Sequence, residues 1–174
     1  MYGIKKALFL AGVLLAFAAS PARAVMTLEV KISLQVVDFI SAPADRAAVA
    51  VVYDKSLGNE SMEEAVGLLQ ALQDAAIQSH SKISPKLMEV HALPAAPGLK
   101  AIILPPGMES ASLLDYGIAN QTLILSMGSA CVREHRCMVG VRAQPEIEIG
   151  LNSPALHDAH IRFADGFQLM VKEY

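Results

Sequence analysis

Tryptophan is absent from this chain of 174 residues, other aromatic residues are few (four Tyr and five Phe), and there are two cysteines. Charge is also scarce, since 18% of the residues are charged and 53% are hydrophobic. This composition excludes an intrinsically disordered chain, which would need fewer apolar residues and more charge. Basic residues are not in surplus, with 14 Lys and Arg against 17 Asp and Glu. We therefore expect no binding to nucleic acid, because little basic charge is available to neutralise phosphates.

The sequence also lacks an apolar run long enough to cross a membrane. The uncharged run Ala7–Ala19 has 13 residues, and as a helix it spans about 20 Å, short of the roughly 30 Å hydrocarbon core. Lys5 and Lys6 precede this run, and Ala22-Arg23-Ala24 follows it. This order is typical of a cleaved secretion signal rather than the alternative, a membrane anchor. We predict that residues 1–24 are a signal peptide and that the exported protein begins at Val25.

The predicted mature protein, residues 25–174, is a periplasmic protein that does not span the membrane. Cleavage would remove three basic residues, Lys5, Lys6 and Arg23, and no acidic residue, so the net charge would change from −3 to −6. The remaining 150 residues are enough for one domain with its own core.

Motifs of common enzyme chemistry are missing as well. The sequence has neither the Gly-x-Ser-x-Gly of a nucleophile elbow nor the Gly-x-x-x-x-Gly-Lys-[Ser/Thr] of a phosphate loop. The five histidines are scattered and suggest no shared metal site: His80, His91, His135, His157 and His160. We therefore predict a protein that is not an enzyme and that uses neither a cofactor nor a metal.

What the sequence does contain is an alternation of strand and helix patterns. Residues 47–53 form a continuous apolar run of seven that ends at Asp54, as expected of a strand buried on both faces. Ser61 and Glu64 then fit a capping box, and apolar residues at helical spacing predict a helix over 62–78. Further strands are predicted at 87–93, 99–104, 122–125, 138–141 and 147–151, with further helices at 109–119, at 153–157 and from Phe163 or Ala164 to Lys172.

This alternation predicts a single-domain α/β fold. We expect a three-layer sandwich whose sheet is mostly parallel, with an antiparallel edge where 138–141 pairs with 147–151.

The segment 27–40 is ambiguous. Leu28, Val30 and Ile32 begin an alternation of apolar and polar residues that is typical of a strand. The same segment places Leu28, Ile32 and Phe39 on one helical face. The period alone favours a strand.

Cys131 and Cys137 are separated by five residues. In an oxidising compartment, two cysteines this close favour a disulfide that pins a polar loop between two strands. Two alternatives remain, namely a metal site that also uses His135 and a redox-active pair.

Asp54 is the best-placed acidic residue, because it follows the first buried strand. Ligands of open parallel sheets bind at the carboxyl ends of the strands. Asp54 is therefore a candidate ligand-binding carboxylate, although a turn-capping carboxylate is the interpretation that we favour.

The closing part of the chain carries a family resemblance. Its successive motifs are Leu123-Ile-Leu-Ser-Met-Gly, a loop with a close cysteine pair, Met138-Val-Gly-Val-Arg142, Glu146-Ile-Glu-Ile-Gly-Leu-Asn152, Pro154-Ala-Leu-His-Asp-Ala-His-Ile-Arg-Phe163 and Phe167-Gln-Leu-Met170. Together with Val51-Val-Tyr-Asp54, this order resembles the YfiR-like family of small periplasmic proteins. Two features depart from the family: the stretch Phe39-Ile-Ser-Ala-Pro43 lacks the usual Trp-Pro, and no second disulfide can form.

The resemblance implies that residues 27–40 form a helix, and we adopt that prediction over the one from periodicity. It also implies a repressor that binds the periplasmic part of an inner-membrane diguanylate cyclase, so the signalling molecule affected would be cyclic-di-GMP. We expect such a protein to act as a homodimer. Phe163, Phe167 and Met170 are candidates for the contact with the signalling protein, although their spacing favours the core-facing stripe of a helix.

A function from another class is a half-size periplasmic domain that binds a small molecule. The parallel-sheet pattern and Asp54 favour it. The two functions differ in what they require, because a ligand receptor needs a pocket with convergent polar groups, whereas a protein-binding regulator needs an exposed apolar patch.

Overall fold

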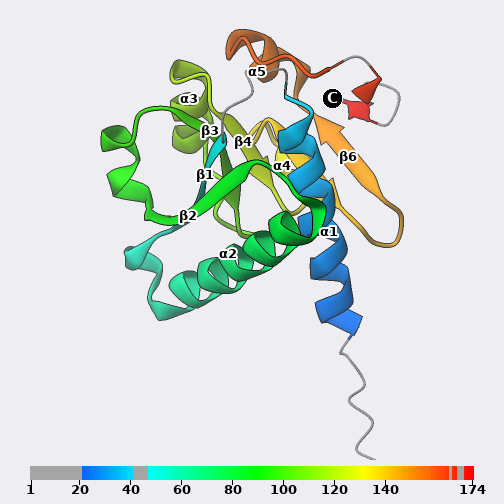
Figure 1. Ribbon diagram of the computed structural model, residues 1–174. Coiled ribbons are helices and arrows are strands. Elements are labelled where there is room, and N and C mark those ends of the chain that lie inside the picture. Colours follow the sequence, from blue (N-terminus) through cyan, green and yellow to red (C-terminus); the bar gives the residue numbers. More distant parts are fainter. Residues whose placement is uncertain (1–20, 41–46, 165, 168–170) are drawn as a thin grey trace, which may run out of the picture.

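The computed structural model describes residues 21–40, 47–164, 166–167 and 171–174 (Figure 1). In these residues, seven strands form one sheet in the order β2-β1-β3-β4-β5-β6-β7. The strands are β1 (Ala47–Tyr53), β2 (Ile83–Glu89), β3 (Leu99–Leu104), β4 (Leu123–Ser126), β5 (Val139–Arg142), β6 (Glu148–Leu151) and β7 (Lys172–Glu173). Neighbouring strands are parallel except for β5 and β6, which are antiparallel. The predicted α/β fold, with a mostly parallel sheet and one antiparallel pair, is therefore confirmed.

The central strands are buried on both faces, as the apolar runs predict. Residues 49–52 of β1 and 101–104 of β3 are fully inaccessible to solvent. β1 and β3 have the bounds that we predicted from the sequence, and β4, β5 and β6 lie within one residue of theirs. A continuous apolar run predicts the strand bounds well here because helices cover both faces of the sheet.

The helices divide between the two faces. α2 (Asn59–Ser79) connects β1 to β2, and α3 (Ala111–Ala119) connects β3 to β4. These crossovers run in opposite directions along the sheet, so right-handed connections place α2 and α3 on opposite faces. α1 (Pro21–Asp38) packs against α2 and β5, and Figure 1 shows α1 and α2 on the same side of the sheet. Two shorter helices, α4 (Ala130–Arg133) and α5 (Ser153–Asp158), complete the α-helices among the described residues.

The structure confirms that 27–40 is mainly helical, as the resemblance implies, and shows that the prediction from periodicity is wrong. Apolar residues are buried on a broad side of α1, which includes Val30, Leu34 and Val37. The exposed positions Lys31, Gln35 and Asp38 recur every three or four residues. The helical period is therefore visible in the spacing of these polar residues and not in that of the apolar residues.

The capping box predicted at Ser61 is also wrong. α2 begins at Asn59, and the residue before it, Gly58, provides no side-chain cap. The Ser61 hydroxyl instead accepts a hydrogen bond from the backbone N–H of Asp54 at 3.1 Å and donates to Met108 Sδ at 3.6 Å. A polar residue expected to cap a helix therefore ties the start of that helix to the end of β1.

The second strand lies four residues earlier than predicted. β2 spans Ile83–Glu89, and a 3₁₀ helix, η2 (Val90–Ala95), occupies most of the predicted range 87–93. Because β2 is an edge strand, it tolerates Pro85 and the exposed residues Ser84 and Lys86, so its sequence lacks an apolar run. The parallel register of Ile83 opposite Ala47 sets its position.

The helix predicted from Phe163 or Ala164 to Lys172 is wrong in the described residues. Phe163 forms an isolated antiparallel bridge with Ile40, and β7 pairs with β6. Gly166 adopts a φ of 92°, which no α-helix accommodates. The ring of Phe167 lies 4.3 Å from that of Phe163 and 5.3 Å from that of Phe39 between centroids. The four-residue spacing thus reflects an aromatic cluster rather than a helical stripe.

Phe167 is 1% exposed, so the prediction that it belongs to the core is confirmed. Met170 and the export signal over 1–20 lie outside the described residues. The predicted cleavage site, Ala22-Arg23-Ala24, falls in the first turns of α1. No helix within the described ranges combines the length and the hydropathy needed to span a membrane.

Tyr174 holds the described C-terminal residues against the sheet edge. Its backbone N–H donates to the Leu151 carbonyl at 2.9 Å, and its hydroxyl donates to Glu148 Oε1 at 2.8 Å. Glu148 also forms an ion pair with Arg142 on the antiparallel neighbour strand. The hydrogen bonds from Arg142 and Tyr174 hold the pKa of the Glu148 carboxyl below its ordinary value.

Candidate functional site

A pocket opens where the connections of the sheet diverge. The chain leaves β1 toward β2 and leaves β3 toward β4, so the two carboxyl ends flank a crevice, the place where open α/β sheets bind ligands. The cavity there has a volume of about 530 Å³. We call it the carboxyl-edge pocket. Its polar lining side chains belong to Asp54, His91, Glu109, Ser110, Ser112 and Tyr116.

Asp54 contributes to this pocket from the end of β1. Its Oδ1 accepts a hydrogen bond from the Ser56 backbone N–H at 2.7 Å, and it caps the short 3₁₀ helix η1 (Lys55–Leu57). The hydrogen bonds from Ser56 lower the pKa of the Asp54 carboxyl, and nearby His91 adds to the effect. Asp54 is therefore a turn cap and also a charged group of the pocket wall.

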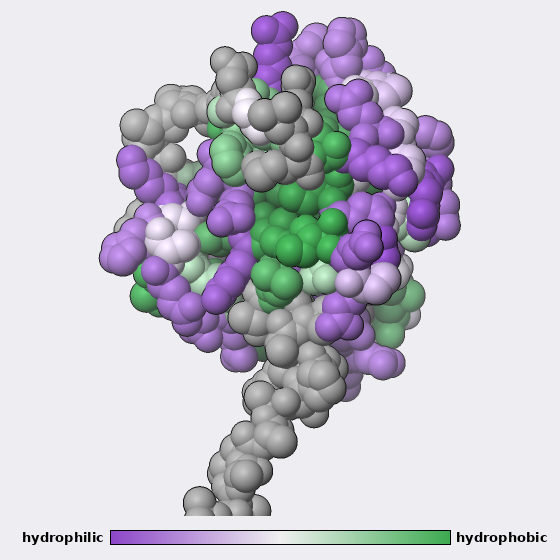
Figure 2. All heavy atoms as spheres, turned by 90° about the vertical axis from the view of Figure 1, so that its right-hand side faces the viewer, coloured by the Kyte–Doolittle hydropathy of each residue, from purple (hydrophilic) through white to green (hydrophobic). Residues whose placement is uncertain are grey.

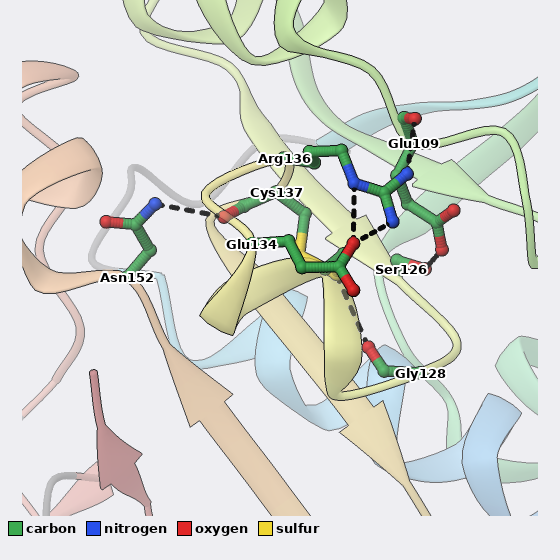
Figure 3. Close-up of a disulfide and its surroundings, with 8 residues drawn as sticks. Glu109, Ser126, Gly128, Glu134, Arg136, Cys137 and Asn152 are labelled. Carbon is green, nitrogen blue, oxygen red and sulfur yellow. Dashed lines mark hydrogen bonds and ion pairs between the residues drawn. A yellow bond between two sulfur atoms is a disulfide. The ribbon is translucent and has the colours of Figure 1, made fainter.

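Glu109, which sequence reasoning missed, supplies the second carboxylate of the pocket. Its Oε1 accepts a hydrogen bond from Ser126 at the end of β4. Its backbone carbonyl accepts a second bond, of 3.0 Å, from Arg136 Nη1 (Figure 3). No local sequence pattern distinguishes it, because its place in the pocket depends on these contacts from other loops.

Arg136 reaches Glu109 from the loop that contains the two cysteines. Figure 3 shows the guanidinium between the Glu109 backbone and the Glu134 carboxylate, and its Nε lies 2.9 Å from Glu134 Oε2. Arg136 is thus paired on one side with an acid and bonded on the other to the pocket wall. The loop supports the position of Glu109.

Cys131 and Cys137 are joined by a disulfide with a Cα–Cα distance of 5.4 Å. Both residues are buried, with exposed fractions of 2% and 0%. Asn152 Nδ2 donates to the Cys137 carbonyl at 3.3 Å, and the Cys131 sulfur contacts the Gly128 carbonyl at 3.3 Å. The disulfide therefore fixes both ends of the loop that carries Arg136. Because each sulfur is bonded to the other, neither is free to ligate a metal together with His135.

α3 and η2 form the remaining wall of the pocket. Ser110 caps α3 by accepting the Leu113 N–H at 3.3 Å. The Tyr116 hydroxyl donates to the Leu93 carbonyl at 3.0 Å and so links α3 to η2. Burial raises the pKa of the Tyr116 hydroxyl. This wall is held by hydrogen bonds before any ligand arrives.

The five histidines do not gather at one site. His91 lines the carboxyl-edge pocket, whereas His157 and His160 line a separate cavity of about 470 Å³ beside α5. Within the described part of the chain, no group of three or more His, Cys, Asp or Glu side chains is arranged to hold a metal ion.

An apolar surface lies on another face of the molecule. Figure 2 shows hydrophobic residues gathered at the centre of the face that contains α1 and β6, with hydrophilic residues on both sides. On this side of the molecule α1 contacts the turn between β5 and β6, because the Glu29 carboxylate accepts the Ala143 N–H at 3.1 Å. Leu28, next to Glu29 in sequence, is 40% exposed, and Ile147, which directly precedes β6, is 60% exposed.

The comparisons with known proteins add no functional assignment. A scan against models of protein families finds none that matches the chain, and a search of curated proteins finds no match.

Proposed function

We propose that this protein is an exported regulatory binding protein that acts in the periplasm as a homodimer and modulates an inner-membrane signalling protein such as a diguanylate cyclase. The resemblance to the YfiR-like family supplies the class of partner. The observation that carries the proposal is the apolar surface over α1 and β6, because a regulator without catalytic groups needs such a surface to bind its partner.

The segment that carries the resemblance supports this proposal. From Leu123 onward it supplies four adjacent strands of the sheet, β4 to β7, and the loop closed by the disulfide. A buried disulfide is typical of proteins that fold in an oxidising compartment, which agrees with export. The segment thus forms one side of the sheet, from β4 to β7.

The test is capture of the signalling protein from membranes by the purified protein, with Ile147→Asp as the variant and Ile77→Asp as the matched control. Both isoleucines are exposed, by 60% and 75%, but Ile77 lies on α2. We expect Ile147→Asp to abolish capture of a diguanylate cyclase while thermal unfolding is unchanged, and Ile77→Asp to retain capture. Equal capture by all three proteins, or recovery of no signalling protein by the wild type, would contradict the proposal.

A second candidate function is small-molecule binding in the carboxyl-edge pocket. The observation that favours it is the convergence of six polar side chains on a cavity of about 530 Å³, which is within the usual size of ligand sites. The two functions are compatible, since a ligand in the pocket could set the affinity for the partner.

A further inference from the structure

The chemistry of the carboxyl-edge pocket restricts the ligand that it can accept. Asp54 and Glu109 are its two carboxylates, and among the described residues that line it none is a lysine or an arginine. Asp54 keeps its Oδ2 and Glu109 its Oε2 after the hydrogen bonds from Ser56 and Ser126, which use Oδ1 and Oε1. The pocket therefore offers two acceptors that carry negative charge.

The basic side chains near the pocket are already paired. Lys55, next to Asp54 in sequence, forms an ion pair with Glu89 at 2.6 Å. Arg136 is paired with Glu134 while it contacts the Glu109 backbone. His91 is the remaining basic group of the lining. Apart from His91, nothing in the lining offsets the charge of the two carboxylates.

The start of α3 does not reverse this preference. Although a helix N-terminus favours anions, Ser110 already accepts the Leu113 N–H there. Two full negative charges also exceed the roughly half charge of a helix end. An anionic ligand would therefore be repelled.

The lining also includes apolar side chains, and most of them are buried. Leu93, Met108 and Leu113 are each at most 9% exposed, and Leu57 is 59% exposed at the rim. A ligand that fills the cavity would contact this apolar wall and would cover Leu57, which would remove its apolar surface from water.

We propose that the carboxyl-edge pocket binds a small organic amine, in which an ammonium group contacts the Asp54 and Glu109 carboxylates and an apolar body lies against Leu93, Met108 and Leu113. This inference rests on the second candidate function, small-molecule binding, and names its ligand class. It places the hydroxyls of Ser112 and Tyr116 within the same lining as additional acceptors for the ammonium protons.

The experiment compares three probes of similar size and different charge: 2-phenylethylamine, 2-phenylethanol and phenylacetate. Protein expressed from the full chain is titrated with each by NMR, with the backbone signals of Val90, Leu113 and Tyr116 as reporters of the pocket. We expect the amine to shift these signals. The alcohol should bind at least roughly tenfold more weakly than the amine, and the acid should not bind.

The variants are Asp54→Asn and Glu109→Gln, which remove charge but keep an oxygen for Ser56 and Ser126. Each should weaken binding of the amine by about tenfold and leave binding of the alcohol unchanged. The matched controls are Asp74→Asn and Glu63→Gln, two exposed carboxylates of α2 outside the pocket, and both should bind the amine as the wild type does.

The remaining outcomes separate this inference from the function on which it rests. Binding of the acid or the alcohol as tight as that of the amine, or unchanged affinity for the amine in both pocket variants, would overturn the amine assignment while small-molecule binding stands. If none of the three probes shifts the pocket signals, both the amine assignment and the second candidate function fail, and the proposal of protein binding is unaffected.

Discussion

Removing the Cys131–Cys137 disulfide should destabilise the protein by an amount that its loop length sets. The bond joins residues six apart in sequence, so the closed loop has seven residues. The chain-entropy relation for such a loop gives about 2.4 kcal/mol at 25 °C. Both cysteines are buried, so Cys→Ala is the suitable replacement, because a serine hydroxyl there would need a partner. We expect the double variant Cys131→Ala/Cys137→Ala to lose about 1–3 kcal/mol.

The assay is urea denaturation of the wild type and the double variant, each with and without a reducing agent. Reduction should lower the stability of the wild type toward that of the variant and should leave the variant unchanged. In thermal unfolding, the expected loss corresponds to a decrease of roughly 3–10 °C in Tm. A variant as stable as the oxidised wild type, two free thiols in the native protein, or bound zinc would refute the reasoning.

Three further predictions concern packing, titration and processing. Gly117→Ala should destabilise by about 1–3 kcal/mol in urea denaturation, because the added Cβ would lie 2.4 Å from Ile124 Cγ1, whereas Gly67→Ala, with no atom within 4 Å, should not destabilise. Glu148→Gln should lower stability by about 1–2 kcal/mol at pH 7. Folding lowers the pKa of Glu148, so the stability from its charge is present above the unfolded value near 4.5 and is lost as pH falls through the folded value. The gap between variant and wild type should therefore narrow as the pH is lowered below 4.5, and a constant gap would contradict this. The intact mass of protein from the periplasm should correspond to a chain that starts at Val25, and a mass that retains residues 1–24 would contradict the signal prediction.

Sequence reasoning succeeded where burial on both faces dominates. The apolar runs of β1 and β3 left no alternative to buried strands, and the bounds agree. It failed where a tertiary partner decides the conformation. β2 is held in place by its register with β1, and the segment around Phe163 and Phe167 is held by packing on Phe39.

The candidate site was predictable only in part. Asp54 was identifiable because it follows a buried strand, and a ligand site at the carboxyl edge follows from the parallel sheet. Glu109 was not identifiable, since its role depends on Ser126 and on Arg136, which is 27 residues away in sequence. No local pattern records such contacts, because they form only when the loops after different strands meet at one edge.

The most direct test of the central claim, regulation of an inner-membrane signalling protein, is the cellular level of cyclic-di-GMP after deletion of the gene. We predict that deletion raises this level, that the wild-type gene and Ile77→Asp restore it, and that Ile147→Asp does not. An unchanged level of cyclic-di-GMP in the deletion strain would contradict the claim.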